Sequence, residues 1–294
     1  MSATGALTLQ APAKINLVLR VLGRRPDGFH ELVTVLQTLD LCDTLELRLR
    51  ARRPEAASGA PDIALSLEGA ASGVPTGADN LAVRGAAAVL DAAGAAGDVG
   101  LDLRLGKRVP AGGGLAGGSS DAAAALRGCN QLLGRPLDEP ALARLAAQLG
   151  SDVAFFLVGG TALCTGRGEV VEPIVPPAPF EVTLLLPPFP TSTAAVYAAW
   201  ASATPRPAPP PDTGALRAAL AGADVAGLQA IFTNDLQAAA RAVEPRLAHL
   251  LDTTRLNLSG SGSTLFGYGR RGDEFPAMRE SSLICWSRSL AGNR

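Results

Sequence analysis

The stretch "GKRVPAGGGLAGGSSDAAAAL", from Gly106 to Leu126, contains the residues whose types and spacing are best suited to chemistry. Ordering a glycine-rich backbone costs entropy, so these glycines indicate that something approaches the main chain too closely for side chains. The N–H groups of such a loop and the positive end of a helix dipole together attract phosphate. The stretch therefore predicts a phosphate-binding loop before a helix, with a flexible linker or a close helix–strand crossing as the alternatives.

Other phosphate and nucleophile motifs do not fit. A Walker loop, GxxxxGK[ST], requires a lysine after the last glycine, but Ser119, Ser120 and Asp121 follow Gly118. The sequence also contains no protein-kinase catalytic loop, no DFG motif and no GxSxG elbow.

Polar residues in two further stretches could complete a site. In "APAKINLVLRV", Lys14 and Asn16 are two residues apart, so in a strand they share one face, opposite the apolar residues around them. In "LGSDVAFF", Asp152 follows a helix stop and precedes an apolar run, where a carboxylate would be half-buried. The alternatives are a solvated surface charge for Lys14 and an ordinary helix N-cap for Asp152.

Hydrophobic periodicity predicts the elements that position these residues. Alternation predicts antiparallel strands over the first fifty residues, with a turn at "PDG" after Arg25, and a strand over "VGLDLRLG". Helical spacing predicts a helix from Asn80, a second after the glycine loop, and a third from Asp138 to Gly150. For the second helix we expect Ser119 or Ser120 as the N-cap.

Prolines interrupt the periodicity at "EPIVPPAPF", and we place a domain boundary there. Residues 1–172 would form an N-terminal domain with the glycine loop, Lys14 and Asp152. Residues 173–294 would form a C-terminal α+β domain. We expect it to contain the strand "VTLLLPP", helices at 195–203, 216–221 and 236–240, and a strand-turn-strand over "RLNLSGSGSTLFGYG".

Composition limits the function. The 294 residues carry a formal net charge of −1 and are 47% hydrophobic, which is typical of a globular protein and offers no basic surface to nucleic acid. The apolar run from Val153 to Cys164 is too short to span a bilayer, and the N-terminus lacks the layout of a signal peptide. The four cysteines lack zinc-site spacing. We therefore expect a cytoplasmic protein that binds small molecules and neither nucleic acid nor membrane.

Six stretches, in this order, resemble the superfamily of galactokinase, homoserine kinase, mevalonate kinase and phosphomevalonate kinase: "PAKINL", "DGFHEL", "DNLAVRGAAAVL", "VPAGGGLAGGSSDAAAAL", "GSDVAFFLVGGTALCTGRGE" and "LSGSGSTLFG". The resemblance covers about Ala11 to Gly267. It implies an α+β, two-domain small-molecule kinase fold, with the glycine loop at a helix N-terminus and the active site between the domains. It also implies ATP as phosphoryl donor, Mg²⁺, and a monomer or homodimer.

Within the superfamily, the chain is similar to the member that phosphorylates a hydroxyl of a cytidine-diphosphate-linked polyol on the non-mevalonate route to isoprenoid precursors. By this resemblance, Asp152 would accept the hydroxyl proton. Lys14 would keep Asp152 ionised and offset charge that develops on the phosphoryl group.

The same resemblance assigns the binding residues. Those for the substrate would be Asn16, Phe29, His30 and Tyr197, with His30 on the cytosine edge and the aromatic rings near the base. Those for ATP would be Pro110, Ala111, Gly112, Gly113, Gly114, Leu115, Ala116, Gly117, Gly118, Ser119, Ser120, Asn80 and Lys107. The loop that closes over the site would contain Gly260, Ser261 and Gly262. The metal ligands stay open, with Ser119 and Ser120 as candidates.

Simpler explanations exist for several of these residues. Asn80 could be a helix cap, Lys107 a surface charge, His30 an ordinary turn residue, and Gly260 to Gly262 a plain hairpin turn. Other functions also stay open. They are a homoserine or mevalonate kinase, which would not need "DGFH", a non-catalytic nucleotide-binding sensor, and a structural protein with a glycine-rich loop.

The sequence departs from the family pattern in two places. Ser151 and Ala154 stand where the family usually has Ala and Pro, a change that should leave Asp152 in place. After Gly267, we expect neither the usual alanine-rich amphipathic helix nor the closing strand. We hypothesise that this end has diverged or that its reading frame was lost, and mass spectrometry of the native protein would separate the two.

Overall fold

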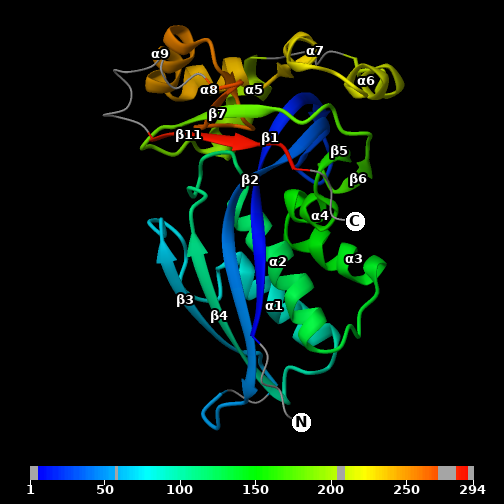
Figure 1. The fold of residues 1–294 in the computed structure, drawn as a ribbon, viewed down its shortest axis with the longest axis vertical. Coiled ribbons are helices and arrows are strands. Elements are labelled where there is room, and N and C mark those ends of the chain that lie inside the picture. The colour runs from blue at the N-terminus through cyan, green and yellow to red at the C-terminus, as the bar shows by residue number, and fades with distance from the viewer. Residues whose placement is uncertain (1–5, 57–58, 204–208, 271–282, 291–294) are drawn as a thin grey trace. The chain divides into compact units, whose positions relative to one another are not determined.

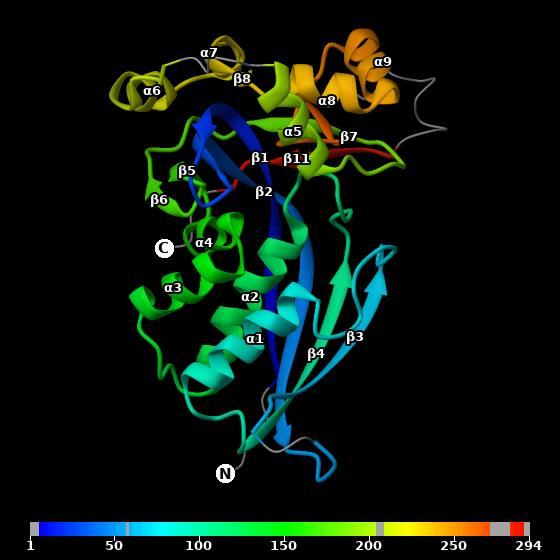
Figure 2. The ribbon, with the colours of Figure 1, turned by 180° about the vertical axis from the view of Figure 1, so that it is seen from behind.

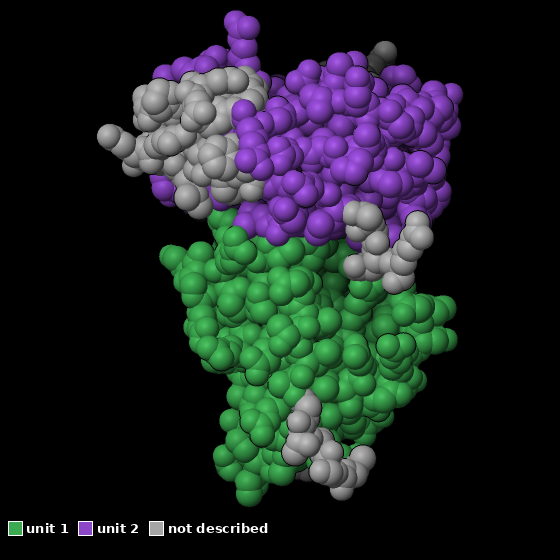
Figure 3. Space-filling view, viewed as in Figure 1, with its two compact units in different colours: residues 1–13, 42–111, 117–157 green, residues 14–41, 112–116, 158–294 purple. Residues whose placement is uncertain are grey.

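The structure, a computed structural model, describes residues 6–56, 59–203, 209–270 and 283–290. It divides into two compact units, coloured separately in Figure 3. Unit 1 comprises Met1–Ala13, Cys42–Ala111 and Gly117–Leu157. Unit 2 comprises Lys14–Leu41, Gly112–Ala116 and Val158–Arg294.

Unit 1 combines strands with helices on one face of them (Figures 1 and 2). The second half of β2 (His30–Ala51) pairs antiparallel with β4 (Val99–Lys107), and β3 (Asp62–Gly69) runs parallel to β4. The helices are α1 (Leu81–Ala92), α2 (Gly117–Leu132), α3 (Glu139–Leu149) and α4 (Ser151–Val158). Leu101, Leu103 and Leu105 are buried, as the alternation along β4 predicts.

Helices α1 and α2 approach each other closely because small residues line their contact. A Cβ atom added at Gly85 of α1 would lie 2.7 Å from the main-chain oxygen of Ala122 in α2. The alanines that follow the glycine loop, Ala122 to Ala125, are buried. Helix α2, which begins with the last residues of the glycine loop, is therefore held firmly in unit 1.

Unit 2 contains the remaining elements. From Lys14 onward, β1 (Ala6–Arg24) lies in this unit. The later strands are β5 (Thr161–Gly166), β6 (Val170–Pro173), β7 (Glu181–Leu186), β8 (Thr233–Asn234), β9 (Asn257–Leu258), β10 (Leu265–Tyr268) and β11 (Leu283–Arg288). The helices are α5 (Thr193–Ala203), α6 (Thr213–Leu220), α7 (Val225–Ile231), α8 (Gln237–Val243) and α9 (Pro245–Thr254).

An aliphatic core joins the helices of unit 2 to its second sheet. The strand order in this sheet is β11-β7-β10-β9, with antiparallel pairing throughout. Helices α5, α8 and α9 contribute Val196, Trp200, Ala240 and Leu247 to a buried cluster that also includes Leu185 of β7. This packing holds the segment between α9 and β10, which contains Gly260, Ser261 and Gly262 of the predicted closing loop.

Most of the predicted elements are confirmed. The α+β class is correct, and the chain turns at "PDG", where the N–H of Gly28 donates to the oxygen of Arg25 (3.1 Å). The Asp138 side chain caps α3 by accepting from the N–H of Ala141 (2.8 Å). Strands β9 and β10 form the predicted strand-turn-strand. Among the described residues, no helix is long and apolar enough to cross a membrane.

Two local expectations are wrong. Helix α2 begins at Gly117, so Ser119 and Ser120 lie inside its first turn rather than capping it. A closing strand does exist after Gly267, because Leu283–Arg288 form β11 and pair with Glu181–Leu186 of β7. That pairing joins segments far apart in sequence, which local periodicity does not reveal. The alanine-rich helix of the family, which we expect to be missing here, would fall on residues 271–282, outside the described ranges.

The compact units also divide the chain differently from the boundary expected after residue 172, which falls inside unit 2. Long-range pairing explains this difference. Residues Leu32 to Gln37 of β2 pair antiparallel with β5, and β5 pairs with β6. The segment from Val158 to Pro173 is thereby bound to strands from the start of the chain.

Candidate active site

Two glycine motifs contact each other in unit 2. The N–H of Thr264 donates to the oxygen of Gly113 (3.0 Å), and the Ser259 hydroxyl donates to the oxygen of Gly114 (3.0 Å). The middle of the predicted phosphate loop, Gly112 to Ala116, is therefore joined to the predicted closing loop, Ser259 to Ser263.

The close approach of the two loops explains why glycine is required. Gly114 has φ +79°, and a Cβ atom there would lie 2.3 Å from the main-chain oxygen of Ser259. Gly260 has φ +59°, and a Cβ atom there would lie 3.4 Å from Nζ of Lys14. The closing loop thus passes directly beside the predicted catalytic lysine.

Lys14 and Asn16 share one face of β1, as predicted. Lys14 Nζ donates to Asn16 Oδ1 (2.8 Å), Asn16 Nδ2 donates to Thr34 Oγ1 (2.9 Å), and Thr34 Oγ1 donates to the oxygen of Val18 (2.6 Å). Lys14 and Asn16 are 4% and 3% exposed, so the surface-charge alternative for Lys14 is wrong. The main-chain N–H of Lys14 also donates to the oxygen of Leu115 (3.1 Å), which joins β1 to the glycine loop.

Asn234, which the sequence did not single out, holds the closing loop in place. Its Nδ2 atom donates to the oxygens of Leu258 and Gly260, both at 2.9 Å. Its Oδ1 atom accepts from the N–H of Leu236 (3.0 Å). No local pattern predicts its contact with the closing loop, because the two oxygens to which it donates come from a distant part of the chain.

The predicted base-binding residues also lie together in unit 2. The rings of His30 and Tyr197 have centroids 4.7 Å apart with a tilt of 31°, and Trp200 packs edge-on against His30 at 5.7 Å. Among the described residues, the buried Nε2 atom of His30 has no hydrogen-bond partner. Burial, and secondarily the charge of Arg24, lowers the pKa of His30, which favours the neutral ring that can both donate and accept.

Phe29 lies at the surface of the same hairpin. Its side chain is half-exposed, and the guanidinium carbon of Arg167, from the β5–β6 turn, lies 4.8 Å from its ring centroid. This cation–π contact restricts the orientation of an otherwise exposed ring. Arg167 was not among the predicted site residues.

The end of the glycine loop and the start of α2 lie in unit 1. Gly118 packs near Leu81 of α1, since a Cβ atom at Gly118 would lie 3.5 Å from Leu81 Cδ1. Ser120 is 1% exposed, and its hydroxyl has no hydrogen-bond partner among the described residues. A buried hydroxyl without a partner at a helix N-terminus is suited to a ligand oxygen or a cation.

Asp152 and Asn80 each lie at the start of a helix of unit 1. Asp152 is the second residue of α4 and is partly buried, so it lies in the first turn rather than at the N-cap. Asn80 caps α1, where its Oδ1 atom accepts from the N–H of Ala82 (2.9 Å) and its Nδ2 atom donates to the oxygen of Pro75 (2.8 Å). The prediction that Asn80 caps a helix is thus confirmed, and its contact with ATP stays a prediction.

Lys107 is not a surface charge. It is 4% exposed, and its ammonium donates to the carboxylates of Asp43 and Asp121, the latter at 2.8 Å. The sequence analysis did not identify Asp43 and gave Asp121 no role. Burial, and to a smaller extent the nearby carboxylate of Asp43, raises the pKa of Asp121 to about 7 against the opposing effect of Lys107.

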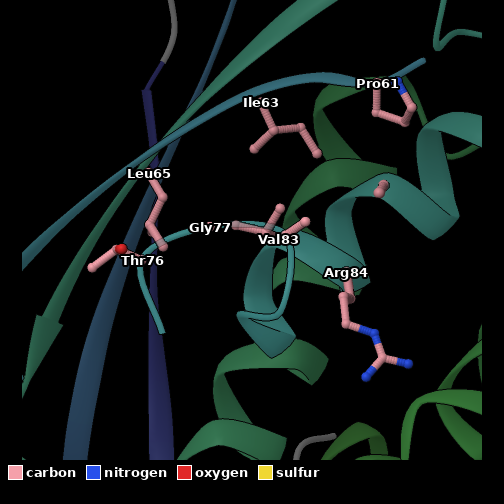
Figure 4. A pocket seen from close by; sticks show the side chains of 9 residues that line it. Pro61, Ile63, Leu65, Thr76, Gly77, Val83 and Arg84 are labelled. Carbon is pink, nitrogen blue, oxygen red and sulfur yellow. The ribbon is translucent and has the colours of Figure 1, made fainter. Parts of the chain in front are cut away.

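A pocket of about 280 Å³ also lies in unit 1, between β3 and α1 (Figure 4). Ile63 and Leu65 of β3 and Val83 of α1 line it, and the guanidinium of Arg84 is directed away from Ile63 and Leu65. It contains none of the predicted site residues. No group of three or more His, Cys, Asp or Glu side chains within the described ranges could hold a metal ion.

Comparison with known proteins first defines a class. The family model described as the GHMP kinases N terminal domain matches residues 80–160, from the cap of α1 to the residue before β5. The structure of homoserine kinase from Cytophaga hutchinsonii superposes with a TM-score of 0.70 at 18% identity, covering 100% of this chain and 97% of that one. The fold is that of the GHMP class of small-molecule kinases.

More similar proteins define the family. The 4-diphosphocytidyl-2-C-methyl-D-erythritol kinase of Pelotomaculum thermopropionicum is 42% identical over 268 residues, which cover 89% of this chain and 88% of that protein. A crystal structure of 4-(cytidine 5'-diphospho)-2C-methyl-D-erythritol kinase has a TM-score of 0.74 at 33% identity and covers 97% of this chain and 100% of its own. The chain belongs to the 4-diphosphocytidyl-2-C-methyl-D-erythritol kinase family, and the family and enzyme class predicted from the sequence are confirmed.

Proposed function

We propose that this protein transfers the γ-phosphoryl group of ATP to the 2-hydroxyl of 4-diphosphocytidyl-2-C-methyl-D-erythritol, giving the 2-phosphate and ADP. The observation that carries the proposal is the arrangement in unit 2, where the buried Lys14–Asn16 pair lies beside Gly260 and the glycine loop is hydrogen-bonded to the closing loop. Phosphoryl transfer depends mainly on alignment and charge stabilisation, which such an arrangement provides.

The proposed step forms a bond between the 2-hydroxyl oxygen and the γ-phosphorus. It breaks the bond from the γ-phosphorus to the β–γ bridging oxygen, which leaves with the electron pair as part of ADP. Asp152, in the first turn of α4, accepts the hydroxyl proton. Lys14 stabilises negative charge on the transferring group, and Asn16 orients the acceptor through the bond that it makes with Lys14.

Loop amides and helix α2 bind the ATP phosphates in this proposal. Mg²⁺ supplies charge neutralisation at the phosphates, and in kinase sites it is bound mostly by substrate oxygens and water. The unpartnered hydroxyl of Ser120 fits the role of an additional oxygen ligand. Asn80 and Lys107 are proposed to lie near the adenine.

Specificity for the cytidyl group is proposed to come from the hairpin that carries Phe29 and His30. The buried Nε2 atom of His30 faces no protein partner among the described residues, so a cytosine edge could satisfy it. Tyr197 supports the His30 ring by stacking and presents an aromatic face to the base. A cytoplasmic location and a monomeric or homodimeric state stay predictions from the sequence.

The test is ATP consumption by the purified protein with the cytidyl substrate, homoserine and mevalonate in parallel. We expect turnover with the cytidyl substrate alone. Asp152→Asn should lower kcat by about 10²- to 10⁴-fold because the general base is lost. Asp138→Asn is the matched control, since asparagine also caps helices and α3 should persist.

Two results would contradict the proposal. Turnover with homoserine or mevalonate would overturn the specificity assigned to His30 and Tyr197. ATP binding without turnover of any alcohol would instead favour a nucleotide-binding sensor.

A further inference from the structure

Three charged side chains form a buried cluster in unit 1. Lys107 Nζ donates to Asp43 Oδ2 and to Asp121 Oδ2. The exposed fractions of the three side chains are 0% for Asp43, 2% for Lys107 and 4% for Asp121. Burying three charged groups away from water costs free energy. Such a cluster is therefore expected to have a specific role in the protein.

The cluster lies at both ends of the glycine loop. Lys107 is the last residue of β4, where the loop begins, and Asp121 follows the first turn of α2, where the loop ends. Asp43 lies on β2, and its Oδ1 atom accepts from the N–H groups of Arg108 (2.5 Å) and Val109 (2.8 Å). The cluster thus binds the first two loop amides and the start of the helix to the same strand.

Packing around Gly117 adds a second constraint. A Cβ atom at Gly117 would lie 2.9 Å from Val109 Cγ1 and 3.3 Å from Asp43 Oδ2. The first residue of α2, Gly117, therefore packs directly against Val109 and the carboxylate of Asp43. A change in Asp43 or Lys107 would move both ends of the loop together.

Lys107 has its charge satisfied within the protein. Its ammonium is paired with two carboxylates, and almost none of the side chain is accessible to solvent. A lysine that bound a phosphate directly would have to leave both carboxylates buried and unpaired, which is strongly unfavourable.

We propose that Asp43, Lys107 and Asp121 are positioning residues for the nucleotide, which hold the entry and exit of the glycine loop in the arrangement that binds the ATP phosphates. This inference rests on the proposed function, and it assigns the Lys107 side chain an action through the loop instead of a contact of its ammonium with ATP. Supporting groups of this kind set the accuracy of a binding site.

The test measures the Kd for ATP by calorimetry without the alcohol substrate, in Lys107→Met, Asp43→Asn and the double variant. We expect each single change to raise Kd at least tenfold and the double change to add less than threefold, because the two residues act as one unit. In steady-state assays, KM for ATP should rise while kcat and KM for the cytidyl substrate change less than threefold.

Conservative and matched variants separate positioning from stability. Asp121→Asn should raise Kd less than Asp121→Ala, since its carboxamide oxygen can still accept from Lys107. Asp62→Asn removes another fully buried carboxylate of unit 1, paired with Arg50 and Arg53, and should lower the melting temperature without changing Kd for ATP. Asp43→Asn keeps an acceptor for the loop amides. If Lys107→Met does not fold, the Kd of Asp43→Asn for ATP therefore tests the positioning role.

Other outcomes overturn the inference. Additive effects of Asp43→Asn and Lys107→Met would mean that Lys107 acts on the nucleotide by itself. Variants that lower the melting temperature but keep Kd within twofold of the wild type would make the cluster purely structural. A wild-type protein that binds no ATP would overturn the proposed function, whereas a wild type that binds ATP as tightly as its variants overturns only the positioning role.

Discussion

At the scale of single residues, His30 combines burial with an unsatisfied hydrogen-bonding atom. Its ring packs against Tyr197 and Trp200 of α5, so packing restricts its orientation before any ligand arrives. A buried Nε2 atom without a partner lowers the stability of the fold. Such an atom is kept where it binds a ligand.

We expect His30→Ala to raise KM for the cytidyl substrate about 10- to 100-fold, because one buried hydrogen bond and one stacking partner are lost. KM for ATP should stay within twofold. Steady-state kinetics would measure both. His249→Ala is the matched control, since His249 is exposed on α9 and is the other histidine of the chain. An unchanged KM in His30→Ala would remove His30 from the site.

The same residue predicts a pH dependence. Burial lowers the pKa of His30, so the ring is neutral at pH 7 and becomes charged only as the pH falls below its ordinary range near 6.5. KM for the cytidyl substrate should therefore be flat above about pH 6.5 and rise in more acidic solution. In His30→Gln, which has no group that titrates there, this rise should disappear.

At the scale of elements, the contact between the glycine loop and the closing loop depends on the absence of a side chain at Gly114. In Gly114→Ala, the new Cβ atom would lie 2.3 Å from the oxygen of Ser259, so the loops must separate. We expect kcat/KM for ATP to fall at least 100-fold.

Gly222→Ala is a close control for that change. Gly222 has φ +73°, similar to the +79° of Gly114, but nothing lies within 4 Å of its added Cβ atom. Both variants therefore bear about the same backbone strain, roughly 1 kcal/mol, while only one has a clash. Equal losses of activity in the two would show that strain, not loop contact, is responsible.

Elements set by local pattern were predictable, and those set by distant partners were not. The cap at Asp138 and the turn at Gly28 follow from nearby residues alone. Strand β11 depends on pairing with β7, and the role of Asn234 depends on the oxygens of Leu258 and Gly260, which are 24 and 26 residues away. The start of α2 was misplaced because the glycines before Ser119 continue into the helix, against their usual propensity.

The same limit applies to the site. Lys14 and Asn16 could be placed on one face from strand geometry, and their hydrogen bond agrees with that placement. Asp43 could not be found, because it meets Lys107 from 64 positions earlier in the chain. The roles of Asp152, His30 and the loop residues came from resemblance to the family, and they stay proposals for this chain.

At the scale of the whole molecule, the buried cluster predicts how stability varies with pH. Burial raises the pKa of Asp121 to about 7, above its value in the unfolded chain, so folding takes up a proton between about pH 4 and pH 7. The stabilisation that comes from protonated Asp121 is fully present below about pH 4, and it is lost as the pH rises through about 7.

Urea unfolding at pH 5 and pH 7.5 would measure this effect. The loss of stability at the higher pH that is due to Asp121 should be absent in Asp121→Asn, and comparison with the wild type removes contributions from groups such as His30. Asp62 provides a contrast, because the Arg50 guanidinium holds its pKa well below the usual range. Its contribution is lost only as the pH falls below about 4, so Asp62→Asn should keep the wild-type change. Identical changes in wild type and Asp121→Asn would contradict the assignment.

The alternation of the chain between the two compact units has a consequence for how such a gene can change. Unit 2 takes residues 14–41, 112–116 and 158–294, and the segments between them belong to unit 1. No single stretch of codons encodes either unit, so one recombination event cannot exchange a complete unit with that of a relative. After a crossover at residue 157, Lys14 and His30 would come from one parent and Tyr197 from the other. Residues of different origin would then have to pack against each other inside unit 2. Substrate preference in this lineage is therefore expected to shift through point changes rather than through domain exchange.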